Sequence, residues 1–320
     1  MNVLLNNYCN LKCSYCFAND VIDREKQSLS LADFRYVLKF HEKSSVHQLN
    51  IIGGEPTLHP KFNELLEMVA KADHIREVLI FTNGNVYPKQ REAIANLARV
   101  KQVGMLINYN APQLLPPGVE QRIHDCIKFL KDDVIFTLGI NFFRENQEYQ
   151  YLLDALKLYK LKFARWSLVV PNSIEKASTN VKDYFNRFKA LICEFLRACE
   201  DEGIIPHVDC NNIPLCLLND KELDDFAYSS ILNLKSSVCQ PVIDILPNLN
   251  AIRCFAINDY EVSIRDVENV QELYELFEKK VDQRYDGVPL FDECRNCMSF
   301  KVKGRSCACL SYKQPVELIS

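Results

Sequence analysis

The sequence predicts an α/β fold built on a mostly parallel sheet, followed by an irregular, cysteine-rich α+β region. Two observations predict it. Short apolar runs alternate with amphipathic helical patterns through most of the chain, and this rhythm breaks near residues 203–214. Strands alternating with helices of this length imply parallel strands joined by right-handed crossovers. The units can form an open doubly wound sheet or a partial barrel, and in both folds ligands gather at the C-terminal strand ends.

Six strand–helix units follow one another in the sequence. Ser30 and Asp33 suit a capping box at the start of the first helix. The expected strands cover residues 3–7, 48–52, 75–82, 100–108, 133–142 and 163–170. The expected helices cover residues 30–43, 60–72, 88–98, 119–131, 147–159 and 181–202.

The part of the chain beyond residue 205 has a different pattern. Apolar runs at 242–246 and 251–257, with turn residues between them, predict a β-hairpin. Residues 268–280 predict a short helix, and residues 291–312 read mostly as loop. We therefore expect two domains, residues 1–205 and residues 206–320.

Composition excludes several classes of protein. The 320 residues carry a formal net charge of −4, which gives no basic surface for nucleic acid. Apolar runs long enough to cross a membrane are absent, and so is the pattern of a signal peptide. We expect a cytoplasmic protein without a nucleic-acid or membrane partner. In a reducing compartment, the 14 cysteines point to metal sites or catalytic thiols rather than disulfides.

Three cysteines directly follow the first expected strand, in the segment CNLKCSYCF. Cys9, Cys13 and Cys16 have a spacing that can wrap around one soft metal centre. A closed structural zinc site needs four ligands, so three leave one metal position open to a substrate or cofactor. The spacing alone leaves a zinc loop as the alternative.

Two further segments decide between these interpretations. Gly53, Gly54, Glu55 and Pro56 end the second expected strand in IIGGEPTLHP, and FTNG ends the third with Asn83 and Gly84. With Tyr15 at the aromatic place of CxxxCx-aromatic-C, the three segments together resemble the signature of the radical S-adenosylmethionine (SAM) superfamily.

This resemblance implies a fold and a chemistry. The fold would be a partial (β/α)6 TIM-like barrel. The three cysteines would hold a [4Fe-4S] cluster whose open iron binds SAM, and reductive cleavage would give a 5′-deoxyadenosyl radical that abstracts hydrogen from the substrate. A reductant such as flavodoxin or ferredoxin would supply the electron. The residues expected to contact SAM are Tyr15, Phe17, Gly53, Gly54, Glu55, Pro56, Asn83, Asn108, Asn141, Arg165 and Val169.

The later cysteines resemble the SPASM and twitch extensions of this superfamily, which bind auxiliary [4Fe-4S] clusters. Cys239 and Cys254 bracket the hairpin, and Cys294 and Cys297 form a later CxxC. The tail departs from the family spacing. Ligands as close in sequence as Cys307 and Cys309 are awkward for one cluster, and we expect one of the pair, Cys309, to bind. We expect one auxiliary cluster. Two clusters using Cys210 and Cys216, and a zinc ribbon, are the alternatives.

The substrate is predicted less sharply than the chemistry. The SPASM/twitch-like tail favours a peptide, as in a maturase of ribosomally made peptides. With only eight residues before Cys9, a separate leader-peptide-binding protein would then be needed. The sulfatase-maturing branch is disfavoured because its Asp after the hairpin cysteine is replaced by Phe255. The alternatives are a dehydrogenase, epimerase or cyclase acting on a sugar or cofactor precursor, and an electron carrier that uses the clusters alone.

Overall fold

The computed structural model divides the chain into two compact units. The first contains Met1–Leu138 and Val242–Phe277, and the second contains Gly139–Pro241 and Glu278–Ser320. The structure describes residues 1–16, 18, 25–171, 179–211, 213–227, 239, 242–305 and 307–313. The late segment 242–277 therefore belongs to the same compact unit as the start of the chain. The expected domain boundary at residue 205 stays a proposal.

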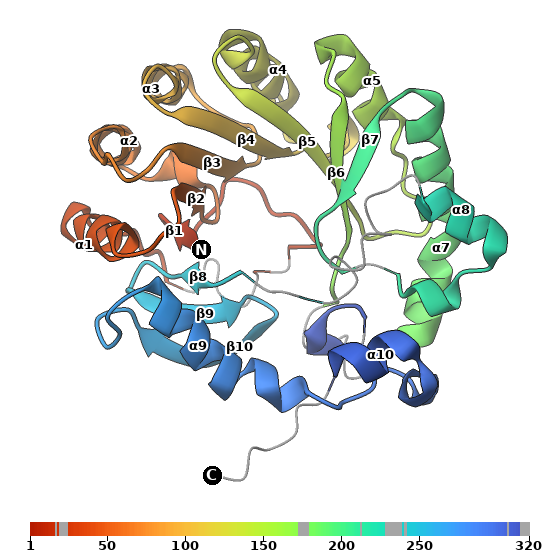
Figure 1. Ribbon diagram of the computed structural model, residues 1–320. Helices are drawn as coiled ribbons and strands as arrows, with labels where there is room; N and C mark the ends of the chain where they lie inside the picture. Colours follow the sequence, from red (N-terminus) through yellow and green to blue (C-terminus); the bar gives the residue numbers. More distant parts are fainter. Residues whose placement is uncertain are drawn as a thin grey trace. The chain divides into compact units, whose positions relative to one another are not determined.

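Parallel strands form the frame of the first unit, as predicted (Figure 1). Their registers pair Asn2 with Asn50, Leu49 with Val78, and Ile80 with Met105. The strands are β1 (Asn2–Leu4), β2 (Gln48–Ile52), β3 (Glu77–Thr82) and β4 (Gln102–Asn108). Strand β5 (Ile135–Phe142) carries the chain from the first unit into the second.

Helices alternate with these strands and lie on their outer side in Figure 1. The predicted cap is present, because the Ser30 hydroxyl accepts the N–H of Asp33 at 3.0 Å. Each helix turns an apolar face inward, and Phe34 and Phe62 are fully buried there. The elements are α1 (Leu31–Glu42), η1 (Pro56–Leu58), α2 (Phe62–Ala70), α3 (Pro88–Ala98), η2 (Pro112–Leu114) and α4 (Val119–Leu130).

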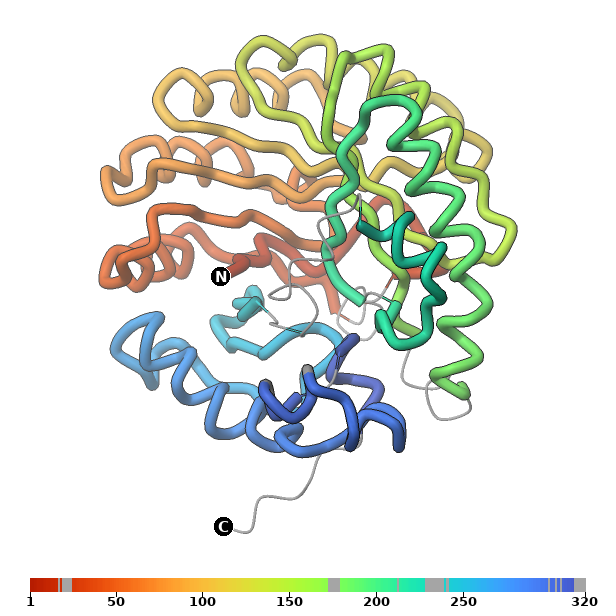
Figure 2. Tube along the Cα trace, turned by 45° about the vertical axis from the view of Figure 1, so that its right-hand side comes forward, coloured from red at the N-terminus to blue at the C-terminus, as the bar shows by residue number. Residues whose placement is uncertain are grey.

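The late segment of the first unit pairs with its first strand. Asn2 is in register with Asp244 in a parallel pair, and Figure 2 shows this segment beside the N-terminal strand. The hairpin is confirmed by the antiparallel pairing of Asp244 with Ile252, and a further antiparallel strand, which the sequence did not predict, follows it. The elements are β8 (Asp244–Ile245), β9 (Asn250–Cys254), β10 (Ile257–Ser263) and α9 (Val270–Lys280).

The second unit continues the strand–helix alternation beyond the expected break. Phe163 pairs with Ile205 and Trp166 with Val208 in a parallel ladder, so residues 205–208 form a seventh strand where the rhythm was expected to break. The tail, expected to be mostly loop, contains a helix. The elements are α5 (Gln150–Tyr159), β6 (Phe163–Leu168), α7 (Val181–Asp201), β7 (Ile205–Val208), η3 (Leu215–Leu217), α8 (Asp220–Ala227), η5 (Asp282–Tyr285), η6 (Asp292–Asn296), α10 (Met298–Lys303) and η7 (Leu310–Tyr312).

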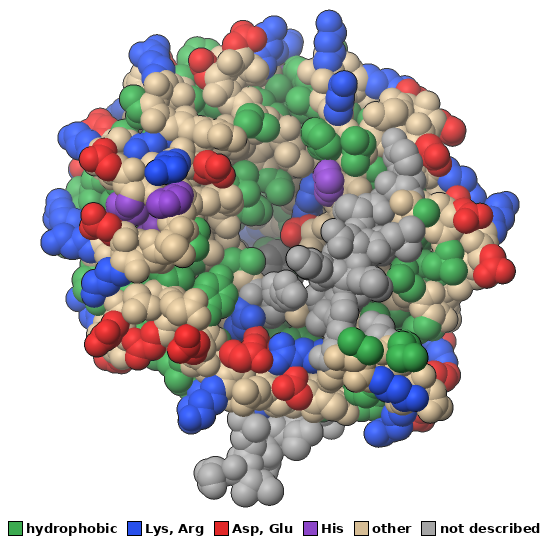
Figure 3. All heavy atoms as spheres, in the orientation of Figure 1, with side chains coloured by type: hydrophobic (Ala, Val, Ile, Leu, Met, Phe, Trp, Pro, Cys, Tyr) green, Lys and Arg blue, Asp and Glu red, His purple; other side chains and the backbone are tan. Residues whose placement is uncertain are grey.

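Two properties of the described residues bear on partners. None of their helices is both long and apolar enough to cross a membrane. On the face shown in Figure 3, Lys and Arg side chains are interspersed with Asp and Glu and form no single basic patch.

Candidate functional site

The end of β2 packs directly against the chain that leads into the first cysteine. Gly54 donates its N–H to the carbonyl of Asn6 at 3.0 Å, and Glu55 donates its N–H to the carbonyl of Tyr8 at 2.9 Å. A Cβ at position 54 would lie closer than 3.0 Å to the backbone of Tyr8, and one at position 53 would lie 2.6 Å from Asn6 Oδ1. The two glycines therefore allow a backbone contact that fixes the residue before Cys9.

Glu55 organises the strand ends from inside the protein. Its side chain is fully buried, and burial raises the pKa of its carboxyl group. One carboxylate oxygen accepts the Thr57 N–H at 3.2 Å and the hydroxyls of Thr57 and Thr82 at 2.7 and 2.8 Å. The other oxygen accepts the Asn83 N–H at 2.8 Å. In this structure the carboxylate serves the protein's own donors, and contact with a SAM ammonium stays a prediction.

Asn83 connects β3 to the first cysteine. Its amide donates to Asn10 Oδ1 at 2.8 Å and lies 3.6 Å from Cys9 Sγ. The N–H of Leu11 also points at that sulfur, at 3.4 Å. Because amide donors aimed at sulfur favour a thiolate, these contacts suit a metal ligand.

Tyr15 connects the second cysteine to the end of β4. Its hydroxyl accepts from Asn108 Nδ2 at 2.7 Å and donates to Asn110 Oδ1. Asn110 is only 8% exposed, and its amide lies 3.9 Å from Cys13 Sγ. The predicted residues Tyr15 and Asn108 are thus brought together, and Asn110 is a site residue that the sequence did not single out.

The three N-terminal cysteines lie in one loop but have different surroundings. Amide groups lie near Cys9 and Cys13, whereas Cys16 contacts apolar side chains. Cys16 donates its N–H to the carbonyl of Cys13 at 3.1 Å and packs against an apolar cluster that contains Phe255. Burial raises the pKa of Cys9 to about 12 and also raises that of Cys13, so the free thiols are protonated. Binding a cluster here would release protons from these thiols.

Among the described residues, no three His, Cys, Asp or Glu side chains stand in a geometry that could hold a metal ion. The donor set nevertheless fits the expected cluster in its chemistry, with three soft thiols in one loop and amides directed at two of them. Phe17, expected to contact SAM, lies outside the described residues, and Pro56 is buried at the start of η1.

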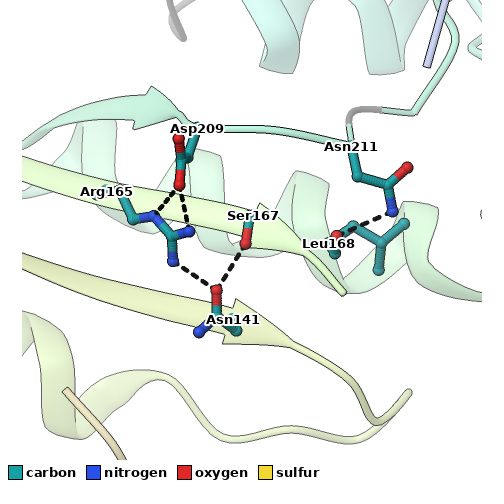
Figure 4. A network of polar contacts seen from close by, with 6 residues as sticks. All are labelled: Asn141, Arg165, Ser167, Leu168, Asp209 and Asn211. Atoms are coloured by element: carbon teal, nitrogen blue, oxygen red, sulfur yellow. Dashed lines mark hydrogen bonds and ion pairs between the residues drawn. The ribbon is translucent and has the colours of Figure 1, made fainter. Parts of the chain in front are cut away.

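Three predicted SAM contacts lie in the second unit. Arg165 Nε donates to Asp209 Oδ2 at 2.9 Å, and the Arg165 guanidinium also donates to Asn141 Oδ1 (Figure 4). The Ser167 hydroxyl donates to the same amide oxygen at 2.6 Å. The Asn141 amide group is therefore held in one orientation, at the end of β5.

The backbone beyond β6 is held as well. The N–H of Val169 donates to the carbonyl of Phe142 at 3.0 Å. Asn211 Nδ2 donates to the carbonyl of Leu168 at 2.9 Å (Figure 4). It also donates to the carbonyl of Val169 at 3.3 Å, and both bonds tie β6 to the chain after β7. The sequence indicated neither Asp209 nor Asn211, because both lie where the strand–helix rhythm was expected to break.

The later cysteines divide between the units. Cys254 belongs to the first unit, whereas the other predicted auxiliary ligands belong to the second. Burial, and then the nearby Cys294, Cys307 and Cys297, raise the pKa of Cys216 to about 11. A neighbourhood of cysteines therefore exists in the second unit and includes Cys216, which was expected only for a second cluster.

Comparison with known proteins agrees with this geometry. The sequence model described as "Radical SAM superfamily" matches residues 3–155. The GTP 3′,8-cyclase of Alkaliphilus oremlandii is 29% identical over 155 residues, which is 44% of this chain and 48% of that protein. The chain thus spans about half the length of this relative.

Two solved structures have a similar fold. The structure of anSMEcpe with bound AdoMet has a TM-score of 0.67 and 16% sequence identity, covering 96% of this chain and 88% of that one. Streptococcus suis SuiB bound to S-adenosylmethionine has a TM-score of 0.64 and 15% identity, covering 94% and 70%. These likenesses confirm the predicted α/β architecture.

Proposed function

We propose that this chain, an enzyme of the radical SAM superfamily, cleaves SAM reductively and uses the 5′-deoxyadenosyl radical to abstract hydrogen from a peptide. When bound, a [4Fe-4S] cluster supplies the electron for the cleavage and an iron that binds SAM. Cys9, Cys13 and Cys16 would hold this cluster, which leaves the fourth iron without a protein ligand.

The observation that carries the proposal is the contact between the end of β2 and the chain before Cys9. A zinc loop needs only its own four ligands, whereas here the Gly54 and Glu55 N–H groups fix the entry to a three-cysteine loop. The backbone around Gly53 and Gly54 is then available to SAM beside the cluster.

The protein's own residues orient and shield this centre in the proposal. Asn83 and Asn110 direct amides at two of the sulfurs, and Tyr15 holds Asn110 in place. Asn108, Asn141, Arg165 and Val169 remain proposed contacts of the ribose, carboxylate and adenine. The network around Asn141 supports such a role, because a fixed amide can discriminate a ligand's donors from its acceptors.

An auxiliary [4Fe-4S] cluster in a SPASM/twitch-like region, residues 206–320, is the second part of the proposal. Its ligands are proposed to be four of the cysteines Cys239, Cys254, Cys294, Cys297 and either Cys309 or Cys307. The proximity of Cys216 to Cys294, Cys297 and Cys307 supports a cysteine-bound centre in this region and adds Cys216 to the ligand candidates.

Two substrate classes remain. The SPASM/twitch-like tail favours a peptide, and one structure of similar fold is described as SuiB bound to precursor peptide SuiA. A small molecule is the alternative, favoured by the sequence likeness to GTP 3′,8-cyclase. A flavodoxin or ferredoxin as reductant, a separate leader-binding protein for the peptide case, and a cytoplasmic location complete the proposal.

The core of the proposal is tested by Cys13→Ala. After anaerobic reconstitution and reduction, the wild type should release 5′-deoxyadenosine from SAM, and Cys13→Ala should not, while auxiliary iron remains. Cys126→Ala is the matched control, because Cys126 is buried in α4 and is not one of the predicted cluster ligands. Retained cleavage in Cys13→Ala would refute the cluster assignment.

Iron content tests the auxiliary cluster. One auxiliary cluster predicts about eight irons per chain and two predict about twelve. Four irons per chain together with bound zinc would exclude an auxiliary iron–sulfur cluster. For the substrate, GTP and a peptide library are compared by how far each stimulates 5′-deoxyadenosine release. If GTP stimulates 5′-deoxyadenosine release and no peptide does, the proposed substrate class changes from a peptide to a small molecule.

A further inference from the structure

Lys313 is a buried lysine whose side chain has no hydrogen-bond or ion-pair partner among the described residues. Its side chain is only 6% exposed, and its ammonium nitrogen has no hydrogen-bond partner in the described part of the chain. An ammonium removed from water normally requires a partner, because desolvation of the charge is costly. The position of Lys313 is fixed by the backbone, since its N–H donates to the carbonyl of Leu310 at 3.0 Å and closes η7.

The groups around Lys313 are mainly thiols. Cys239, Cys294 and Cys307 lie close enough for their charges to act on the ammonium. Cys216 in turn lies near Cys294 and Cys307. The lysine therefore belongs to the same cysteine neighbourhood that the second unit assembles.

Carboxylates of this region are bound by another cation. Arg305, which also acts on Lys313, donates to Asp286 at 2.5 Å and to Glu278 at 2.6 Å. These two carboxylates are thereby neutralised by the guanidinium. The buried ammonium of Lys313 is left beside cysteine side chains, which are thiolates when they bind a metal.

We infer that Lys313 is the buried counter-charge of a metal–thiolate centre formed by the cysteines of the second unit. Four thiolates around a [4Fe-4S]²⁺ core carry a net charge of −2. This negative charge would compensate the positive charge of the buried Lys313 ammonium. The inference rests on the auxiliary cluster proposed above. It adds that Lys313 raises the reduction potential of that cluster, because a nearby cation stabilises the more negative, reduced state.

The test compares Lys313→Met with Lys301→Met in reconstituted full-length protein. Lys301 is an exposed residue of α10, so its replacement removes the same charge from the surface. We expect Lys313→Met to keep its iron and to show a lower auxiliary-cluster midpoint in a redox titration followed by electron paramagnetic resonance. The ratio of oxidised to reduced cluster at the wild-type midpoint should rise about tenfold, equivalent to 59 mV for one electron. Lys301→Met should leave the ratio within twofold.

Lys313→Arg separates charge from packing. It keeps the charge and should keep the wild-type midpoint. If Lys313→Met releases the auxiliary iron while Lys313→Arg retains it, the charge is needed to hold the centre, which also supports the inference. An unchanged midpoint in an iron-loaded Lys313→Met would overturn it, as would equal effects of the Met and Arg variants.

The two proposals fail in different ways. If wild-type protein contains only four irons per chain and no zinc, it has no auxiliary metal centre. Both the auxiliary cluster and the role of Lys313 are then refuted. If zinc occupies the centre, the auxiliary cluster is excluded, but the counter-charge is still tested by zinc content. Loss of zinc in Lys313→Met with retention in Lys313→Arg would support it, and equal zinc in both would overturn it.

Discussion

The carbonyl oxygen of Tyr8 occupies the space that a side chain at Gly54 would need. The contact joins the end of β2 to the residue directly before Cys9, and the Glu55 N–H donates to the same oxygen at 2.9 Å. The glycine pair thus determines where the cysteine loop begins. This gives GGEP a structural role in the protein itself, separate from any contact with a ligand.

Gly54→Ala should therefore displace the cysteine loop. Its methyl group meets backbone, which moves less readily than a side chain, and we expect a loss of about 2 to 4 kcal/mol in the free energy of unfolding. The iron of the first cluster should fall to less than half. Gly104→Ala is the control, because its methyl group meets mainly the end of the Leu79 side chain at 3.0 Å. Iron content and urea unfolding measure both variants, and equal behaviour would contradict the proposed role.

Tyr15→Phe should loosen the link between the loop and β4. Without the hydroxyl, Asn108 Nδ2 and Asn110 Oδ1 lose a partner in a partly buried site, which costs about 1 to 3 kcal/mol. We expect 5′-deoxyadenosine release to fall about tenfold or more. Tyr87→Phe, at a tyrosine that is 47% exposed, should leave the rate unchanged. A normal rate in Tyr15→Phe would show that Asn110 is held by other contacts.

Arg165→Lys should weaken SAM binding without removing iron. Lysine keeps the charge but cannot reach Asp209 and Asn141 together with a planar fork. We expect the KM for SAM to rise about fivefold or more, with kcat changed less than twofold. The control is Arg187→Lys, whose exposed ion pair with Glu145 belongs to the same unit. If kcat falls and KM does not, Arg165 acts on a later step.

The stability of the first unit should fall as pH rises, because of Asp244. Burial raises the pKa of this 3% exposed carboxyl group to about 7, despite the 2.7 Å hydrogen bond from Asn2. Since the folded pKa exceeds the unfolded one, the stabilisation is present below about pH 4 and is lost between pH 4 and 7, up to about 4 kcal/mol in total.

Asp244→Asn should flatten that dependence. Urea unfolding between pH 4.5 and 7.5 should show a smaller loss for Asp244→Asn than for the wild type. Asp73→Asn, at an exposed position, is the control and should follow the wild type. Parallel curves for Asp244→Asn and the wild type would assign the dependence to another group.

The sequence predicted the elements whose periodicity is strong and missed those that depend on neighbours. All six strand–helix units are present within a few residues of their expected bounds. Strand β7 was missed because Pro206 and His207 weaken the pattern, and only its pairing with β6 makes it a strand. Strand β10 was missed because it is largely polar and its register shifts between Ile257 and Glu261.

The site divides in the same way. Motif spacing placed Cys9, Cys13 and the glycines at strand ends, where parallel strands bring them together. Asn110 and Asn6 were missed because each lies beyond a strand end, and only contacts with distant residues give them a role. The hydrogen bonds from Thr82 and from the Asn83 N–H to the buried Glu55 were not predicted either, although the two motifs were expected to meet.

The pairing of β1 with β8 has a consequence for how the protein is made. Asn2 and Asp244 are hydrogen-bonded across 242 positions of sequence. The ribosome adds about 5 to 20 residues per second, so β8 is synthesised roughly 12 to 48 seconds after β1. Until then, the edge of β1 that pairs with β8 has no partner strand. During that time an apolar strand with unpaired backbone groups is open to association with other nascent chains. Chaperone supply and translation rate should therefore influence the yield of folded protein.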